Sequence, residues 1–386
     1  MTRKLYYEDC HLLAFTAKVT GCEPAENRWR ITLDATAFYP EGGGQAADVG
    51  ALGGVRVLDT REEGETIIHF CDGPLEVGST VEGQVDEAHR FDLMQQHTGE
   101  HIVSGLLHSR FGYENTGFHV GKDVMEVDFS GTLTAEDIDW VEKEANRAIW
   151  QNLPVKCWYP TPEELPNVVY RTKRALPWPV RIVQVGTVDS CACCGIHVAY
   201  TGEVGLIKII SAAKFHGGVR LEMVCGQRAW DYVAAVCAQN RQVSQLFSAR
   251  PLETAAAAQK IADSLAAEKY RCWELEKQLL GITAQNYVNC VNPVHFEASL
   301  SGNALRELAE QMSRVCQGFS AVFTGEDSSY RYCLASREQD LRPIGKALTT
   351  ALNGRGGGKP EAQQGTVCAT RKEIEDYFRS LSQVAR

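Results

Sequence analysis

Short apolar runs alternate with polar positions through residues 1–85, and glycine or aspartate interrupts the runs at intervals of about ten residues. The stretches at 28–40 and 54–73 show this alternation most clearly. Period-two alternation with frequent turn residues is typical of antiparallel strands. We therefore expect residues 1–86 to form a small antiparallel β-barrel that carries a glycine-rich strip.

The period of the apolar positions changes to 3.6 residues at Glu87, which predicts a helix from Glu87 to Arg110 with Gly112 as its stop signal. One stripe of this helix carries Phe91, Met94, His97, His101, Ser104 and His108. A second helix is expected at 134–152, capped by Thr134 with Asp137 three positions on. Strands are expected at 154–159, 180–185 and 204–211. Residues 87–227 should therefore form an α+β core.

Residues 228–280 contain few helix breakers, and six apolar residues recur there at spacings of three and four, with one interruption at Glu268: Ala258, Ile261, Leu265, Cys272, Leu275 and Leu279. A helix over 252–280 would be about 43 Å long at 1.5 Å per residue. It would be either a spacer or arm that packs within the chain, or a zipper that makes a homodimer. We assign residues 228–284 to this helical spacer.

Strand and helix patterns resume after Tyr287, followed by a glycine-rich turn at 353–358 and a final helix from Arg371. Residues 285–386 should form a small C-terminal α/β domain. The expected fold class of the whole chain is α+β, with the barrel, the core, the long helical spacer and this third domain in that order.

Composition sets limits on partners and location. The 386 residues suffice for two or three domains, and 39 Lys and Arg against 49 Asp and Glu give a net charge of −10. A nucleic-acid partner must therefore meet a local basic patch. No apolar run approaches the roughly 20 residues that cross a bilayer, and the start lacks a secretory signal, so we expect a cytoplasmic protein without membrane contact. The 14 cysteines are scattered except at 191–194, as expected for reduced thiols with one metal site.

Two distant pairs of residues have metal-ligand spacing. His97 and His101 stand four apart on one helical face, and the metalloprotease motif is excluded because Thr98 stands where that motif has glutamate. Cys193 and His197 form C-x-x-x-H in a glycine-containing turn. Three imidazoles and a thiolate suit Zn²⁺. On spacing alone, Cys191 or Cys194 could replace Cys193. An ion with all four ligands bound is structural, or must loosen one of them for catalysis.

A second unusual stretch runs from Thr36 to Gly50 and includes Gly42, Gly43, Gly44 and Gln45. Successive glycines let backbone amides approach a ligand closely, and Gln45 adds a donor and an acceptor beside them. A β-bulge or a hairpin loop is the alternative interpretation.

Five motifs occur in a fixed order: T-x-F-Y-P-x-G-G-G-Q-x-x-D-x-G, H-T-x-x-H-I-V-S, G-F-H-V-G at 117–121, C-x-x-x-H-V-x-x-T-G-E-V-G-L-I-K-I, and R-L-E-M-V-C-G-x-R-A at 220–229. Together they resemble the editing domain of alanyl-tRNA synthetase. Because no aminoacylation domain stands in front, the chain resembles the free-standing alanyl-tRNA editing proteins of the AlaX family. GRGGGKPEAQQG at 354–365 resembles the glycine-rich loop in the C-terminal domain of the long form, AlaX-L. It is not a P-loop, because Pro360 follows Lys359.

The resemblance implies trans-editing: hydrolysis of the aminoacyl ester of mischarged Ser-tRNA(Ala), with Gly-tRNA(Ala) as a further substrate. It implies a zinc set of His97, His101, Cys193 and His197, although the family usually has C-G-G-T-H where Cys194 and Ile196 stand here. Gly43, Gly44 and Gln45 would stabilise the developing oxyanion, and Thr36, Gly42 and His119 would line the substrate site, with Thr36 as the reader of the seryl hydroxyl.

The tRNA partner would be held by Arg355 and Lys359 on either side of Gly356, Gly357 and Gly358, since bare amides beside basic groups can bind phosphate oxygens. Further basic candidates near the core are Arg171, Lys173, Arg174, Lys208, Lys214 and Arg220. The alternative function is a non-catalytic tRNA-binding or synthetase-associated module with structural zinc. The related editing domain of threonyl-tRNA synthetase shares the H-x-x-x-H and C-x-x-x-H pairs without the third-domain glycines.

Overall fold

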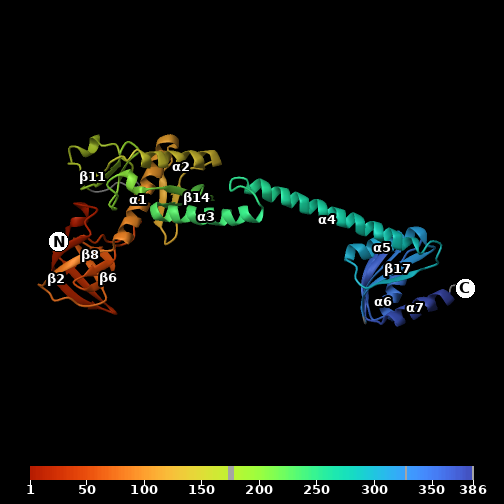
Figure 1. Cartoon of the computed structure of the whole chain (residues 1–386). Coiled ribbons are helices and arrows are strands. Elements are labelled where there is room, and N and C mark those ends of the chain that lie inside the picture. Colours follow the sequence, from red (N-terminus) through yellow and green to blue (C-terminus); the bar gives the residue numbers. More distant parts are fainter. Residues whose placement is uncertain (173–177, 327, 385–386) are drawn as a thin grey trace. The chain divides into compact units, whose positions relative to one another are not determined.

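The computed structural model describes residues 1–172, 178–326 and 328–384, and it forms two compact units, Met1–Gln242 and Val243–Arg386 (Figure 1). Both units combine helices and sheets, so the expected α+β class is confirmed. The boundary between the units falls within the helix Gly226–Leu246 (α3). The three domain boundaries expected from the sequence, after residues 86, 227 and 284, remain predictions. In the described parts of the chain, no helix combines the length and the apolar character that a membrane crossing requires.

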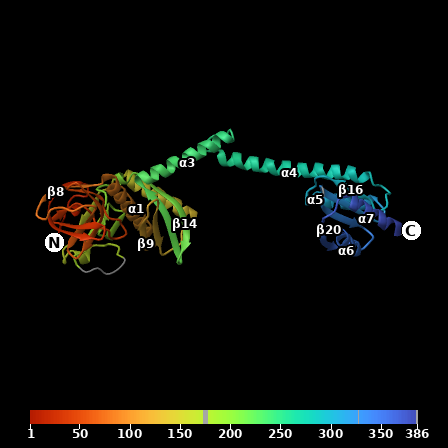
Figure 2. The ribbon, with the colours of Figure 1, turned by 90° about the horizontal axis from the view of Figure 1, so that it is seen from below.

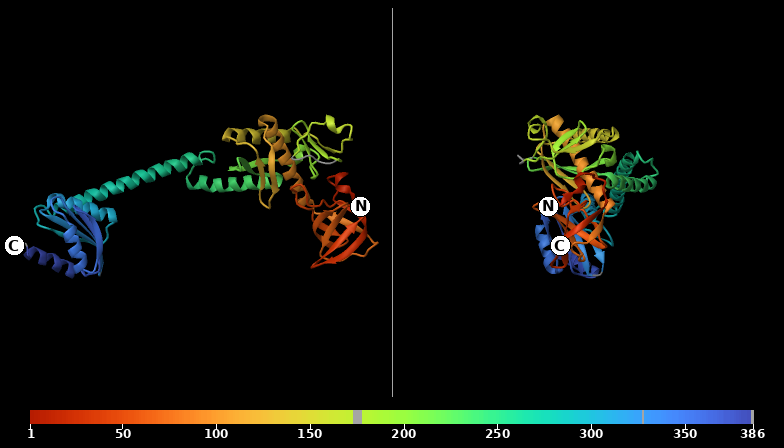
Figure 3. Two further views of the ribbon diagram at one scale, coloured as in Figure 1. Left: turned by 180° about the vertical axis from the view of Figure 1, so that it is seen from behind. Right: turned by 90° about the vertical axis from the view of Figure 1, so that its left-hand side faces the viewer.

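The N-terminal part of the first unit is a ring of six antiparallel strands (Figure 3). Neighbours pair in the order β2-β3-β7-β6-β5-β8, and β8 pairs with β2, which closes the barrel. The bounds are β2 (Ala14–Ala25), β3 (Arg28–Leu33), β5 (Gly50–Leu52), β6 (Val55–Glu63), β7 (Thr66–Cys71) and β8 (Thr80–Val85). The alternating residues fill its core, for example Val19, Ile31 and Leu33. Before the ring, β1 (Arg3–Lys4) pairs in parallel with β4 (Ala35–Thr36), and η1 (Leu5–Tyr7) follows β1.

The rest of the first unit surrounds one central helix, α1 (Glu87–Phe111), whose buried residues lie on all its sides. It packs against α2 (Ala135–Trp150) and against strands of two sheets. One sheet has the order β14-β15-β10-β9 and the other the order β11-β12-β13. The strand bounds are β9 (Asn115–Val120), β10 (Met125–Phe129), β11 (Val155–Trp158), β12 (Ile182–Val185), β13 (Asp189–Ala192), β14 (Ile207–Phe215) and β15 (Gly218–Cys225), and the 3-10 helices are η2 (Leu165–Asn167) and η3 (Thr201–Val204).

The two expected helices of the core begin and end where their capping residues predict. Asp86 caps α1 by accepting a hydrogen bond from the His89 amide, and Gly112 ends the helix in the left-handed conformation with φ 70°. Thr134 and Asp137 form a reciprocal capping box at the start of α2. The helix predictions at 87–110 and 134–152 are therefore confirmed to within two residues at each end.

The second unit contains a five-stranded sheet of order β16-β17-β18-β20-β19 with helices on both faces. Along β17, Phe319 and Phe323 face one cluster of buried residues, whereas Val322 faces the other, as the alternation of a strand requires. On the Val322 side, α5 lies between the sheet and the C-terminal end of α4 (Figure 2). The bounds are α4 (Thr254–Gln285), β16 (Val294–Glu297), α5 (Gly302–Val315), β17 (Phe319–Glu326), β18 (Ser329–Ser336), α6 (Arg342–Ala351), β19 (Arg355–Lys359), β20 (Ala362–Val367) and α7 (Arg371–Val384).

Helix α4 corresponds to the helix expected at 252–280, shifted towards the C-terminus by several residues. Only its last turns are covered, where Leu280 and Ala284 pack against α5. The seam residues Ile261, Leu265, Leu275 and Leu279 are between 47% and 64% exposed. Because no described residue covers this seam, a homodimer through α4 remains a proposal.

The prediction of a glycine-rich turn at 353–358 is wrong. Residues 355–359 form strand β19, paired with β20 at the edge of the sheet. A Cβ at Gly356 would lie 2.2 Å from the Tyr332 hydroxyl, and a Cβ at Gly358 would lie 2.2 Å from the Ala362 carbonyl. The glycines therefore allow a close approach between strands. Because glycine has a low strand propensity, the sequence did not predict a strand here.

Candidate metal centre

Helix α1 brings two of the expected ligands to one place. His97 and His101 are one turn apart and both are 2% exposed. Two glycines of the same helix permit close packing, because a Cβ at Gly99 would lie 2.2 Å from the Cys225 sulfur and a Cβ at Gly105 would lie 2.4 Å from the Val188 carbonyl. Strand β15 and the turn before β13 can therefore pack closely on α1.

The loop after β13 supplies Cys193 and His197. Arg181 fixes its path by donating hydrogen bonds to the Cys193 and Gly195 carbonyls at 2.9 and 2.8 Å. Gly195 must be glycine, because a Cβ there would lie 2.1 Å from Cε1 of His97. The loop geometry thus depends on a buried arginine that the sequence motif does not include.

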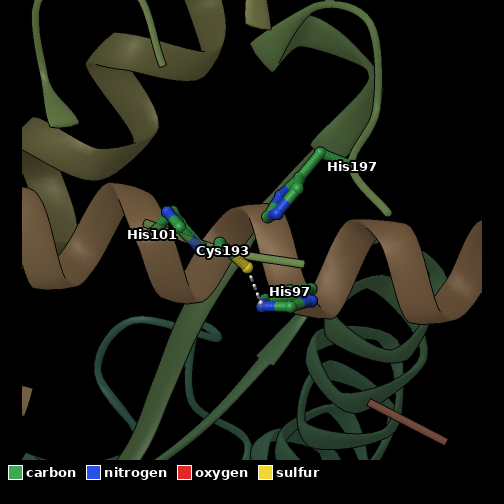
Figure 4. Close-up of side chains that lie close together, drawn as sticks. All are labelled: His97, His101, Cys193 and His197. Carbon is green, nitrogen blue, oxygen red and sulfur yellow. Dashed lines mark hydrogen bonds between the residues drawn. The ribbon is translucent and has the colours of Figure 1, made fainter. Parts of the chain in front are cut away.

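The four side chains converge in the structure (Figure 4). One donor atom from each of them lies within 4.8 Å of the others, and Cys193 Sγ is 3.5 Å from His97 Nε2. Among the three cysteines left open by spacing, Cys193 joins the histidines, whereas Cys191 lies in a neighbouring group with His101 and Asp189.

Each histidine is held through Nδ1, on the side away from the centre. His97 Nδ1 donates to Gln45 Oε1 at 2.8 Å, and His101 Nδ1 donates to Asp189 Oδ2 at 2.9 Å. His197 Nδ1 lies 3.2 Å from the Thr98 hydroxyl. Such partners fix the tautomer, so that Nε2 of each ring can serve as a ligand.

The electrostatics of the centre favour a thiolate. Burial alone raises the pKa of Cys193, but the nearby His97 charge and hydrogen bonds from the three histidines bring this pKa well below its ordinary value. Burial likewise works against the protonated form of His101, yet its hydrogen bond to Asp189 raises its pKa well above 6.5. The pKa of Asp189 falls to about 2 despite burial, because His101 and Arg171 donate hydrogen bonds to it. Thiolate is the form in which cysteine binds metals.

This donor set fits a metal ion. The Nε2 atom of His197 is buried and has no hydrogen-bond partner among the described residues, so that a cation would satisfy it. Three imidazoles and one thiolate at this spacing match the ligand preference of zinc, and each imidazole has an outer partner.

A cavity of about 470 Å³ opens beside the four groups. Its lining includes His97, His101 and Cys193, together with Gly43 and Gly44. Gly42 and Gln45 pair with each other across Gly43 and Gly44, whose φ angles are 61° and 86°. The glycine strip is therefore a tight two-residue turn of type I′, which needs positive φ at both central positions.

Within the described residues, the amides of Gly43 and Gly44 donate no hydrogen bond. Gln45 is 1% exposed and does not line the cavity; its Oε1 accepts from His97 and from the Ile196 amide at 3.2 Å. Gln45 thus orients His97, and its buried Nε2 has no hydrogen-bond partner among the described residues.

Two expected substrate residues lie elsewhere. Thr36 is fully buried, and its hydroxyl is bonded to His69 Nε2 at 2.8 Å. His119 is exposed and absent from the cavity lining, which includes its neighbour Phe118. Neighbouring residues of a strand point to opposite faces, so that Phe118 stacks on His97 at a centroid distance of 5.1 Å while His119 faces away from it.

The expected tRNA-binding residues Arg355, Gly356, Gly357, Gly358 and Lys359 are all exposed on β19. Of the basic residues near the core, Lys173 and Arg174 lie outside the described residues. Three others are engaged in ion pairs within the first unit: Arg171 with Asp189, Lys208 with Glu142, and Arg220 with Asp128.

Sequence reasoning did not assign a role at the metal centre to the residues that surround the ligands. Asp189, Arg171, Thr98, Phe118, Arg181 and Glu100 all belong to this set. Thr98 and Glu100 lie between the two histidines of α1, and Asp189 lies two residues before Cys191. Their proximity to the ligands in the sequence was the available signal, but only the fold shows which atoms they contact.

Comparison with known proteins places this site in a class. The pattern of the threonyl and alanyl tRNA synthetase second additional domain matches residues 180–221, which include Cys193 and His197. The pattern of the class II (A) tRNA synthetases matches residues 3–89, which include the barrel. The first unit therefore defines a synthetase-type editing domain.

Three relatives are similar along most of the chain. The alanyl-tRNA editing protein Aarsd1-B of Xenopus laevis is 28% identical, with 95% of each chain covered. The alanyl-tRNA editing protein AlaX-L of Pyrococcus horikoshii is 27% identical, with 97% of each chain covered. The alanine–tRNA ligase of Thermofilum pendens is 31% identical over 99% of this chain, which spans 44% of that enzyme. The chain belongs to the alanyl-tRNA editing proteins of the AlaX type.

Among solved structures, the C-Ala domain of the Aquifex aeolicus alanyl-tRNA synthetase matches 25% of this chain and 93% of its own length, with 16% identity and a TM-score of 0.21.

Proposed function

We propose that this protein, an aminoacyl-tRNA deacylase by its family, acts in trans on tRNA(Ala) mischarged with serine and also hydrolyses Gly-tRNA(Ala). The proposal is carried by one observation: three histidines and a cysteine converge, and His97, His101 and Cys193 of this set line a cavity together with Gly43 and Gly44, whose amides donate no hydrogen bond within the described residues. An aminoacyl ester is already activated, so its hydrolysis requires a positioned water, a polarised carbonyl and donors for the oxyanion.

The residues take separate roles in this proposal. His97, His101, Cys193 and His197 hold Zn²⁺, which would supply Lewis-acid polarisation or water activation when bound. Gly43 and Gly44 donate their amides to the developing oxyanion, and Phe118 provides an apolar wall. Gln45 holds the orientation of His97. Arg355 and Lys359 on β19 contact the tRNA backbone.

The proposal is tested with tRNA(Ala) charged with serine, glycine or alanine and mixed with the purified full chain. Release of serine and glycine is expected, while Ala-tRNA(Ala) stays charged. Cys193→Ser should abolish the activity, whereas Cys237→Ser, at an exposed cysteine of α3, should not change it. Equal rates on the seryl and alanyl esters, or no hydrolysis of any ester, would refute the proposal.

One observation favours the second candidate, a tRNA-binding module with structural zinc. Four protein ligands fill a tetrahedral site, which is typical of structural zinc. In that case the purified chain would bind tRNA(Ala) and contain zinc, but Ser-tRNA(Ala) would decay at its uncatalysed rate.

A further inference from the structure

The carboxylate of Glu100 is buried beside the metal centre. Glu100 occupies the position on α1 just before His101, and its side chain is 7% exposed. It lines the same cavity as His97, His101 and the glycine turn. The cavity therefore contains a potentially charged group next to the place where an ester carbonyl would bind.

The orientation of this carboxylate is fixed from one side. Glu100 Oε1 accepts a hydrogen bond from the Ser104 hydroxyl at 2.5 Å and another from the side-chain amide of Asn115. Ser104 lies one turn further along α1, and Asn115 begins β9. Both donors use Oε1, which leaves Oε2, 3.9 Å from His101 Nε2, as the other acceptor.

In the described part of the chain, the basic side chains near Glu100 have other partners: His101, whose Nε2 lies 3.9 Å from Oε2, belongs to the proposed metal ligand set. No lysine or arginine there forms an ion pair with Glu100, and Arg171, which lines the same cavity, is engaged by Asp189. Glu114, the other acidic residue of the cavity lining, is 53% exposed and pairs with His108. A buried carboxylate without a cationic partner of its own is costly unless a bound cation compensates it.

Glu100 is not part of the metal ligand set itself. The group of donors that lie within 4.8 Å of one another contains His97, His101, Cys193 and His197 but not Glu100. Its carboxylate therefore stands at the edge of the centre, where a cationic part of a bound substrate would lie.

An aminoacyl ester carries such a cation, since one carbon separates its α-ammonium group from the ester carbonyl. We propose that Glu100 is a specificity-determining residue that binds the substrate α-ammonium through Oε2 while Ser104 and Asn115 hold Oε1. This inference rests on the proposed deacylase function. It makes the site selective for esters of free amino acids, since an ester without the ammonium forms no ion pair with Oε2 of Glu100.

The test compares Ser-tRNA(Ala) with glyceroyl-tRNA(Ala), the ester of glyceric acid, in which a hydroxyl replaces the ammonium with little change in size. Each kcat/KM is divided by the spontaneous hydrolysis rate of the same ester, which removes the difference in intrinsic reactivity. The native protein should prefer the seryl ester by about 100-fold. In Glu100→Gln, which keeps an acceptor for Ser104 and Asn115, the seryl rate should fall by about the same factor and the ratio should approach one.

Controls separate this role from a structural one. Glu87→Gln, at an exposed glutamate in the first turn of α1, should keep the native ratio. Bound metal per chain, measured by elemental analysis, should be equal in Glu100→Gln and the native protein. The inference is overturned if Glu100→Gln lowers both rates equally, if it loses the metal, or if the native protein does not distinguish the two esters. The proposed function fails separately, if the native protein does not hydrolyse Ser-tRNA(Ala).

Discussion

The single residues that matter most at this site contact the histidines from behind. Gln45, Asp189 and Thr98 each bond the Nδ1 atom of one histidine, and they come from three different segments of the chain. The spacing of His97 and His101 could be recognised in the sequence because a helix places residues four apart on one face. The role of Asp189 could not be recognised in the sequence, because its partner His101 is 88 residues away and only tertiary packing brings them together.

Asp189→Asn tests this support directly. Asparagine keeps an acceptor for His101 but lacks the negative charge that Asp189 presents to His101 and Arg171. Loss of an outer partner typically weakens metal binding about 10- to 100-fold. We expect this loss in a competition titration with a chromophoric chelator, while Asp139→Asn on the exposed side of α2 should bind as tightly as the native protein. Unchanged affinity in Asp189→Asn would show that Asp189 does not support the centre.

His69 should make the barrel sensitive to acid. Burial lowers the pKa of His69 from 6.5 to about 4, so that the unfolded chain takes up a proton at a pH where the folded barrel does not. Stability contributed by neutral His69 is therefore present above pH 6.5 and is lost as the pH falls through 4, by roughly 3 kcal/mol in total. His69→Gln, which can still bond Thr36 and the Ile31 carbonyl, should lose less stability over this range.

Pulse proteolysis in urea at pH 7, 6 and 5, followed on peptides of the barrel, measures the free energy of unfolding of the native and His69→Gln proteins. An equal fall in stability in the native and His69→Gln proteins would assign the acid sensitivity to other groups. The same experiment tests whether Thr36 has a structural role, because the Thr36 hydroxyl is bonded to His69.

At the scale of elements, helices were predicted more accurately than glycine-rich segments. The capping residues of α1 and α2 are local, so that their bounds followed from the sequence. The two glycine runs have different structures: residues 42–45 form a tight turn at the cavity, whereas residues 355–359 form an edge strand. Glycine permits both conformations, and the choice depends on distant neighbours such as Phe118 and Tyr332.

The tight turn at the cavity leads to a paired prediction. A Cβ at Gly44 would lie 2.5 Å from the Phe118 ring, in addition to the strain of φ 86°, whereas a Cβ at Gly43 would meet nothing within 4 Å. Gly43→Ala should therefore cost about 1 kcal/mol, from backbone strain alone. Gly44→Ala should cost about 2–3 kcal/mol and should displace Phe118. Thermal unfolding of both variants beside the native protein measures the order, and equal losses would contradict the contact with Phe118.

At the scale of the whole molecule, the chain consists of two compact units, and the metal centre and its cavity belong entirely to the first. The second unit presents Arg355 and Lys359 on an exposed edge strand. Fold class and the order of elements could be predicted because they depend on periodicity. The boundary inside α3 could not, because a continuous helix gives no local signal where contacts change from one unit to the other.

We proposed that the second unit binds tRNA and that the first hydrolyses the ester. Removal of the positive charges on β19 should therefore weaken tRNA binding and leave the chemical step unchanged. The double variant Arg355→Ala and Lys359→Ala should raise KM for mischarged tRNA about tenfold with kcat unchanged, and it should lessen the salt dependence of binding by about one to two phosphate contacts. Arg337→Ala, at another exposed arginine of the second unit, is the matched control. A loss of kcat with unchanged KM would contradict this role.

The most direct test of the central claim is deacylation of Ser-tRNA(Ala) before and after removal of the metal from the full chain. The account predicts one zinc ion per chain, loss of activity when a chelator removes it, and recovery in proportion to the zinc restored. Full activity in protein shown by elemental analysis to contain no metal would contradict the claim that His97, His101, Cys193 and His197 form the catalytic metal centre.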